Sequence, residues 1–317
     1  MGDHKTAPVA GATESNAGSA GPNLRGIGAM VAACAAFACG DTIMKVLADT
    51  APTSQLILIR GAFVLVGAFV ACVWLGAFAV LHRALSGAMA VRAASDTAGA
   101  WSFQLALARM PYADISAIGQ LSPLTITAAS ALFFAERVGW RRWTATVIGL
   151  MGVLLIIRPG SSTFNWWALA GIGSVLASTF RDLATRRVDP TVPPPLIMLF
   201  SAGLTTITAL FTLSFAGDWV WPPVHVVVGL LGAAMFSLFG QLCTIVAVRS
   251  GDISAVMPFR YSIIVFAIFS GVVVFGQLPD GATLAGIVIV CGAGLYTFYR
   301  EQALRRMAAI SSEKAAT

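Results

Sequence analysis

The chain has 317 residues, of which 57% are hydrophobic and only 11% are charged. A soluble domain carries about 25% charged residues, so this composition excludes an ordinary water-exposed globule and predicts a protein embedded in lipid. The formal net charge is +6, but the basic residues are scattered singly or in pairs between apolar runs. No continuous phosphate-binding stripe appears, which argues against a nucleic-acid partner.

Ten apolar stretches follow one another along the chain, and a membrane-spanning helix needs about 20 such residues. We predict spans at residues 26–46, 55–78, 90–108, 113–134, 143–158, 166–186, 195–217, 226–248, 253–276 and 282–299. The connections are brief, so sequential helices should be antiparallel neighbours in one bundle. Residues 1–24 are expected to form a disordered cytoplasmic tail, and residues 301–317 a polar cytoplasmic tail.

The loops differ strongly in basic residues, and this difference predicts the orientation. If both termini are cytoplasmic, fourteen Lys and Arg residues lie in cytoplasmic segments, and only Arg109 and Arg158 lie in outer loops. The sequence therefore predicts a multi-pass protein of the cytoplasmic (inner) membrane with both termini inside. This arrangement also requires an even number of spans.

The phrase Asp-Ile-Ser-Ala occurs twice, at 114–117 and 252–255, 138 positions apart. Further matches join 132–158 to 272–300, and 39–52 to 180–193, at an offset of about 141. We interpret the chain as two five-helix repeats, residues 25–159 and 160–300. Because five is odd, the repeats would run through the membrane in opposite directions, which is the usual basis of alternating access. Duplication retained only for folding is the alternative.

The segments FFAERVGWRRWTATVIGLMGVLLIIRPG and ALARMPYADISA resemble the EamA-like permeases of the drug/metabolite transporter superfamily, over about residues 24–300. The resemblance implies a ten-helix carrier. In the second half this family often has an acid where Gln277 stands here, which argues against an essential acid at that position. The segments DTIMK and RDLATRR also resemble carriers described as taking up S-adenosylmethionine.

Polar groups inside a membrane cost about 2.5–3.5 kcal/mol each on insertion scales, so they should face the bundle interior. Arg260 is the strongest candidate for substrate binding, because it follows Pro258 and a guanidinium at a loosened helix suits a carboxylate or phosphate. An Arg satisfied by carbonyls or by a fixed ion pair is the alternative. The substrate-binding candidates are Arg260, Tyr261, Arg60, Gln120, Trp101 and Gln241. For Arg60 the alternative is snorkelling, and for the aromatic residues it is packing or lipid contact.

Two acid–base pairs at i, i+4 spacing stand at matching places in the repeats and are candidates for gating or proton coupling. They are Asp41 with Lys45 and Asp182 with Arg186. Asp96 is a further candidate, and proton coupling would pass through Asp41, Asp96, Asp182 or the substrate itself. Purely structural ion pairs are the alternative.

The five cysteines all lie in apolar runs without a CxxC pair, and the three histidines are dispersed, so no metal and no cofactor is expected. The sequence lacks a GxxxxGK[ST] loop, which argues against ATP drive from this chain. We expect a secondary transporter of a small polar or amphipathic metabolite that has the lipid bilayer as a partner. A homodimer and a monomer are both compatible with the sequence. An integral membrane enzyme acting on a lipid-linked group is the alternative, but its loops should carry acid–base clusters that these short loops lack.

Overall fold

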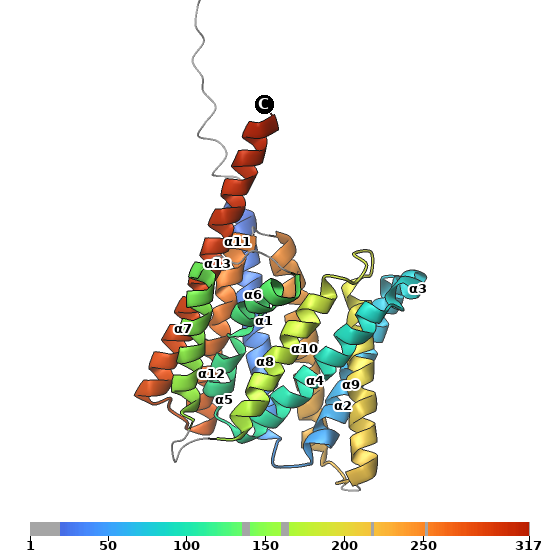
Figure 1. Cartoon of the computed structure of the whole chain (residues 1–317). Helices are drawn as coiled ribbons and strands as arrows, with labels where there is room; N and C mark the ends of the chain where they lie inside the picture. The colour runs from blue at the N-terminus through green and yellow to red at the C-terminus, as the bar shows by residue number, and fades with distance from the viewer. Residues whose placement is uncertain (1–19, 135–139, 160–164, 217–218, 251–252, 317) are drawn as a thin grey trace, which may run out of the picture.

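The computed structural model describes residues 20–134, 140–159, 165–216, 219–250 and 253–316. Throughout these residues the regular structure is helical, without a strand (Figure 1). The elements are α1 (Ala20–Val46), α2 (Thr53–Trp74), η1 (Ala77–Val80), α3 (Leu81–Ala84), α4 (Gly87–Arg109), α5 (Tyr112–Gly119), α6 (Ser122–Phe134), α7 (Trp140–Ile157), α8 (Trp167–Thr185), α9 (Pro194–Ala216), α10 (Val224–Ser250), α11 (Ile253–Val256), η2 (Met257–Tyr261), α12 (Ser262–Phe275) and α13 (Gly281–Ala316).

Every predicted span coincides with helical structure, and six segments are long and apolar enough to cross a membrane. These six are Asn23–Val46, Thr53–Trp74, Pro194–Phe215, Val224–Ala247, Met257–Phe275 and Gly281–Arg300. In α7 the apolar part, Trp143–Ile157, is shorter. Helices α4 and α8 carry charged residues that lower their hydropathy. The all-helical membrane architecture is therefore confirmed, whereas hydropathy alone does not give ten spans.

Two of the predicted spans are interrupted rather than continuous. The span expected at 113–134 is divided into α5 and α6 by a turn at Gln120 and Leu121, and Pro123 lies in the first turn of α6. The span expected at 253–276 is divided into α11, the 3-10 helix η2 with Pro258, and α12. Proline fits a first helical turn because its missing N–H has no intrahelical partner there.

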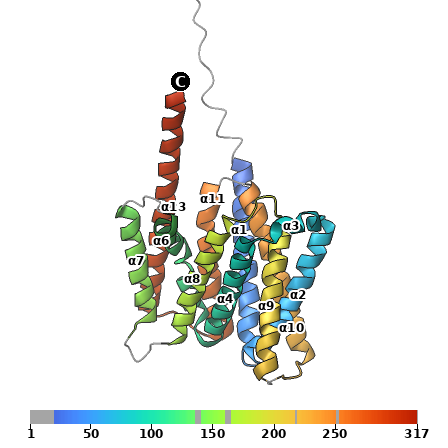
Figure 2. The ribbon, with the colours of Figure 1, turned by 45° about the vertical axis from the view of Figure 1, so that its right-hand side comes forward.

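The chain ends also differ from the prediction. Residues 1–19 lie outside the described residues, and α1 already begins at Ala20, within the predicted tail. The predicted C-terminal tail is helical, since α13 continues to Ala316 and projects from the bundle (Figures 1 and 2). Helix α2 ends at Trp74 instead of 78, because Gly76 adopts a left-handed conformation with φ of 60°.

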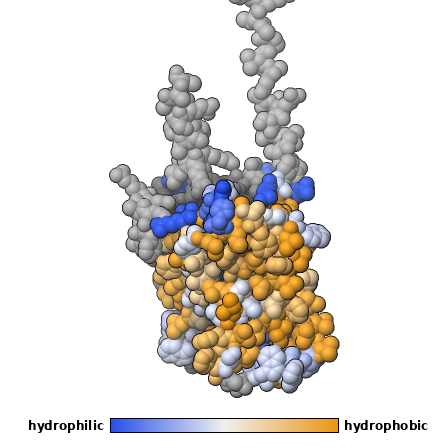
Figure 3. Space-filling view, turned by 90° about the vertical axis from the view of Figure 1, so that its right-hand side faces the viewer, coloured by the Kyte–Doolittle hydropathy of each residue, from blue (hydrophilic) through white to orange (hydrophobic). Residues whose placement is uncertain are grey.

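The helices associate mainly in four long pairs, each joining the first half of the chain to the second. α1 packs along α10, α4 along α8, α2 along α9, and α7 along α13. Buried apolar side chains hold them together, and Leu56, Leu107, Ile115 and Leu230 are at most 2% exposed. Figure 3 shows apolar side chains over the flank of the bundle and the most hydrophilic ones at the end from which α13 projects.

Helices α7 and α13 approach closely at two glycines, Gly152 and Gly286. A Cβ atom added at Gly286 would lie 2.7 Å from the backbone oxygen of Gly152. Small residues of this kind let membrane helices touch backbone to backbone.

We expect Gly286→Ala to destabilise the bundle by about 1–3 kcal/mol, because the clash with backbone can be relieved only by separating the two helices. Thermal unfolding of the purified protein measures the effect. The control is Gly292→Ala on the same helix, where a Cβ atom meets nothing within 4 Å. Equal unfolding temperatures for the two variants would contradict the proposed contact.

Candidate functional site

A cavity of about 620 Å³ lies in the middle of the bundle. It is lined by residues of α1, α2, α4, α5, α6, α8, α10, η2 and α12. Seven of the residues predicted for binding or gating line it: Asp41, Arg60, Asp96, Gln120, Asp182, Gln241 and Arg260. The fold therefore gathers into one space polar residues that are more than 200 positions apart in the sequence.

The cavity reaches one end of the bundle and is blocked at the other. At the open end, where α13 projects, it extends to Thr185 in the last turn of α8 and to Arg92 near the start of α4. Beyond Asp41, at the closed end, the side chains of Met44, Leu47, Leu107, Met110 and Tyr112 are at most 6% exposed and belong to one apolar cluster. Packed side chains thus block the cavity at one end of the bundle and leave it open at the other.

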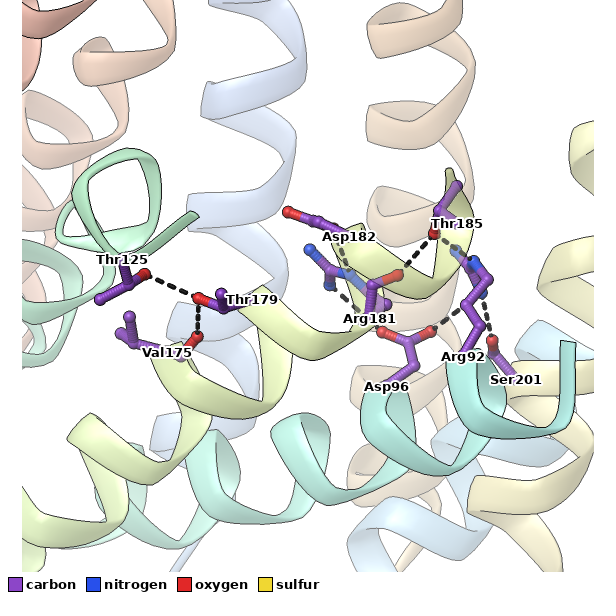
Figure 4. A network of polar contacts seen from close by, with 9 residues as sticks. All are labelled: Arg92, Asp96, Thr125, Val175, Thr179, Arg181, Asp182, Thr185 and Ser201. Carbon is purple, nitrogen blue, oxygen red and sulfur yellow. Dashed lines mark hydrogen bonds and ion pairs between the residues drawn. The ribbon is translucent and has the colours of Figure 1, made fainter. Parts of the chain in front are cut away.

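Four charged side chains near the open end form the α4–α8 cluster, which consists of Arg92, Asp96, Arg181 and Asp182 (Figure 4). Arg181 donates to Asp182 at 2.8 Å and to Asp96 at 3.2 Å, and Arg92 lies 3.8 Å from the second oxygen of Asp96. Arg92 also donates to the hydroxyls of Thr185 and Ser201, at 3.0 and 2.8 Å. Each charge in the cluster thus has an opposite charge beside it.

A nearby contact in Figure 4 joins the broken span to the second half of the chain. The hydroxyls of Thr125 on α6 and Thr179 on α8 lie 2.7 Å apart, and Thr179 donates to the carbonyl of Val175 at 2.9 Å. Thr179 is only 3% exposed. This pair fixes the first turn of α6, just after the helix break, against α8.

Deeper in the cavity, Asp41 on α1 and Arg60 on α2 carry opposite charges that attract each other without touching. Their nitrogen and oxygen atoms make no contact within the 4.0 Å limit of an ion pair. Asp41 accepts a hydrogen bond from the Tyr112 hydroxyl at 3.3 Å. Arg60 donates to the Ser237 hydroxyl at 2.6 Å, and its buried Nε has no partner among the described residues. The inner end therefore presents one acid and one base to the cavity.

Arg260 lies in η2, at the interruption of the second broken span, and its side chain is exposed to the cavity. Within the described part of the chain its guanidinium has neither an ion pair nor a hydrogen-bond partner. The Cys34 thiol on α1 lies 3.4 Å from the Arg260 carbonyl oxygen and 3.9 Å from that of Phe259. The helix is thus interrupted at Pro258, and the backbone carbonyls of Phe259 and Arg260 beside the break contact the Cys34 thiol of α1.

Four predicted residues do not line the cavity. The Trp101 indole donates to Thr208 on α9 at 3.1 Å, so it bridges two helices. The Tyr261 hydroxyl is buried against Gly294 of α13 and has no hydrogen-bond partner among the described residues. Arg186 is the exposed C-cap of α8, and Asp182 pairs with the adjacent Arg181. Lys45 lines a separate pocket at the closed end.

The predicted ion pair between Asp41 and Lys45 is absent from the described residues, because Lys45 is held elsewhere. Its ammonium donates to the carbonyls of Leu107 and Met110, at 2.8 and 2.5 Å, and lies 5.4 Å from the centre of the Phe275 ring. The last carbonyls of a helix lack intrahelical partners and attract cations. Lys45 therefore ties α1 to the ends of α4 and α12 at the closed end.

Several residues that complete the site were not predicted from the sequence. Arg92, which stands in the span predicted at 90–108 but was not selected as a candidate, lies i, i+4 from Asp96 on α4, and this spacing was the signal that could have identified it. Gln104 on α4 also lines the cavity. Tyr112 and Ser237, the partners of Asp41 and Arg60, had no sequence signal, because the fold alone brings them together.

A second link at the closed end joins the end of α7 to the start of α13. Arg158, the residue after α7, donates to the carboxylate of Asp280, which also accepts a hydrogen bond from the backbone N–H of Thr283 at 2.9 Å. Asp280 is thus both the N-cap of α13 and an ion-pair partner. The hydrogen bond from Arg158, with those from Thr283, lowers the pKa of Asp280 to about 2.

This pKa predicts how the link responds to pH. Because the folded carboxyl has a pKa below its ordinary value of 3.8, its stabilisation is complete above that value and is lost as pH falls through about 2. The difference in unfolding temperature between the parent and Asp280→Asn should therefore be constant from about pH 8 to about pH 5 and should shrink only in stronger acid. A difference that already shrinks between pH 8 and pH 6 would assign the effect to another group.

Comparisons with known proteins agree with this architecture. Residues 24–158 match the EamA-like transporter family. A riboflavin transporter of Vibrio cholerae is 28% identical over 58% of this chain and 62% of its own length, so the match spans less than two thirds of that relative. An S-adenosylmethionine uptake transporter of Rickettsia bellii is 25% identical over 64% of this chain and 68% of its own length.

The pseudopaline exporter CntI of Pseudomonas aeruginosa is 29% identical over 59% of this chain and 66% of its own length. A solved crystal structure aligns with a TM-score of 0.55 over 90% of this chain and 99% of that chain, at 18% identity, and shows that the fold is shared. These relatives are named as transporters and not as enzymes. Residues 24–158 therefore form an EamA-like transporter family domain.

Proposed function

We propose that the protein is a secondary active transporter that moves a small polar or amphipathic metabolite across the cytoplasmic membrane by alternating access. The observation that carries this proposal is the charged central cavity, open at one end of the bundle and closed at the other by packed apolar residues. A route closed at one end only is what a carrier presents while it waits for substrate on one side.

The proposal includes ten spans arranged as two inverted repeats. In the two predicted repeats α1 corresponds to α8, α2 to α9, α4 to α10 and α7 to α13. When each helix is replaced by its counterpart, the packed pair α1–α10 becomes the packed pair α8–α4, and the pairs α2–α9 and α7–α13 become themselves. The two interrupted spans are also exchanged, since the α5–α6 break corresponds to the break at η2. Both correspondences support a pseudo-two-fold relation, and an odd number of spans in each half makes that relation an inversion.

The distribution of basic residues supports cytoplasmic termini, because most of those described lie in or near the helix ends on the side where α1 begins and α13 projects. In this orientation the cavity opens to the cytoplasm. The relatives named for riboflavin, S-adenosylmethionine and pseudopaline support a substrate of metabolite size with polar groups. Asp41, Asp96 and Asp182 are the acids in the cavity that could couple transport to a proton gradient.

Transport by purified protein in vesicles tests this function. We expect solute exchange that saturates with concentration, and proton coupling would appear as faster uptake under an imposed pH gradient. Vesicles prepared with the denatured protein serve as the negative control. Turnover of a lipid-linked compound without solute movement would refute the proposal and favour an enzyme.

A further inference from the structure

The charges that line the cavity are not equally available to a substrate. Seven ionised side chains line it, four arginines and three aspartates, and four of them belong to the α4–α8 cluster. In that cluster two arginines and two aspartates neutralise one another. The remaining three, Asp41, Arg60 and Arg260, have no ion pair within the described residues.

These three residues lie at two levels of the cavity. Asp41 and Arg60 face it at the inner end, beside the apolar cluster that closes the bundle. The backbone of Arg260 lies at the level of Cys34, and seven helical residues from Cys34 to Asp41 rise by about 10 Å. The backbone that carries Arg260 is thus about 10 Å nearer the open end than the backbone of Asp41.

Each of these groups retains bonding capacity toward a ligand. Arg60 uses one terminal nitrogen on Ser237, and its Nε is buried without a partner in the described chain. The Arg260 guanidinium is exposed to the cavity, and none of its donors has a partner among the described residues. Guanidinium groups bind carboxylates with paired, charge-assisted hydrogen bonds, and an aspartate binds an ammonium group.

From this arrangement we propose that the cavity binds an elongated amino acid with two acidic groups. Its amino-carboxylate end would bind between Asp41 and Arg60, and its second acidic group would bind Arg260 about 10 Å nearer the open end. The inference rests on the proposed function and narrows its substrate class. A ligand with a net positive charge, such as S-adenosylmethionine, does not complement the two arginines and one aspartate.

Binding to the purified full-length protein tests the inference with three eight-carbon compounds. L-2-Aminosuberate carries both carboxylates and the ammonium, L-2-aminooctanoate lacks the distal carboxylate, and suberate lacks the ammonium. Isothermal titration should give 2-aminosuberate an affinity at least about tenfold higher than either analogue, because each analogue leaves one charged group of the site unpaired. Equal affinities, stronger binding of S-adenosylmethionine, or no binding of 2-aminosuberate by folded protein would overturn the inference.

Two variants assign the ends of the ligand. Arg260→Gln should lower the affinity for 2-aminosuberate about tenfold and leave 2-aminooctanoate unaffected. Asp41→Asn should weaken both amino acids but not suberate. If Asp41→Asn does not fold, the affinities of the three compounds for the parent protein still test the proposed substrate class. Weakening of all three compounds alike by Arg260→Gln would refute its assignment to the distal acid.

Vesicle transport separates this inference from the proposed function. If riboflavin or S-adenosylmethionine is transported while 2-aminosuberate neither binds nor moves, the inference fails and the transport function stands. If 2-aminosuberate binds as described but no solute moves in either direction, the function fails and the binding site stands.

Discussion

Replacing Arg260 by alanine is expected to reduce transport roughly a hundredfold or more, because a paired guanidinium contact with an anionic substrate group is lost. The fold should survive, since Arg260 is exposed and makes neither an ion pair nor a side-chain hydrogen bond within the described residues. Substitutions at such positions usually change the free energy of unfolding by no more than about 0.5 kcal/mol. Initial transport rates in vesicles, with the amount of inserted protein measured in parallel, give the result.

A matched control for Arg260→Ala is Arg249→Ala. Arg249 lies in the last turn of α10, is exposed, and does not line the cavity. Its removal changes the net charge by the same amount and should leave transport unaltered. Normal transport by Arg260→Ala, or an equal loss in both variants, would remove Arg260 from the binding site.

The architecture could be predicted from the sequence because it depends on local properties. Apolar runs of membrane length predicted the positions of the helices, and Pro123 and Pro258 stand at the two places where helices break. The helix breaks themselves could be predicted from the sequence only in part. A proline predicts a weakened helix, but whether the chain turns, as at Gln120 and Leu121, depends on the helices packed around it.

The candidate site was predicted less completely, because its geometry is set by tertiary packing. Polarity within an apolar run selected Asp41, Arg60 and Arg260, which line the cavity, since an unpaired charge is unfavourable in lipid. The same criterion misplaced Lys45, whose long side chain reaches the carbonyl ends of α4 instead of Asp41. Trp101 and Tyr261 point at neighbouring helices, and the direction of an aromatic side chain has no signature in a single sequence.

Arg181 illustrates why partners are harder to predict than positions. In the sequence it stands beside Asp182 and far from Asp96. In the structure it bonds to both carboxylates and so joins the first half of the chain to the second. Such a neutral cluster also explains how four charged residues of α4 and α8 can line an open cavity without being available to the substrate.

Exchanging Lys45 for methionine is expected to open the closed end, because methionine keeps an apolar stem but loses both hydrogen bonds to the carbonyls of Leu107 and Met110. Bonds to charged groups contribute about 1.5–3 kcal/mol each, enough to shift a two-state equilibrium more than tenfold. In a cysteine-free background, a reporter cysteine at Met44, which is 3% exposed, should then react at least about tenfold faster with a membrane-impermeant maleimide applied at that end. Lys45→Arg retains the charge and the donors and should remain slow, whereas a cysteine at Leu278, which is 79% exposed, should react equally in every background. An unchanged rate at position 44 in folded Lys45→Met protein would show that the apolar cluster closes this end without Lys45.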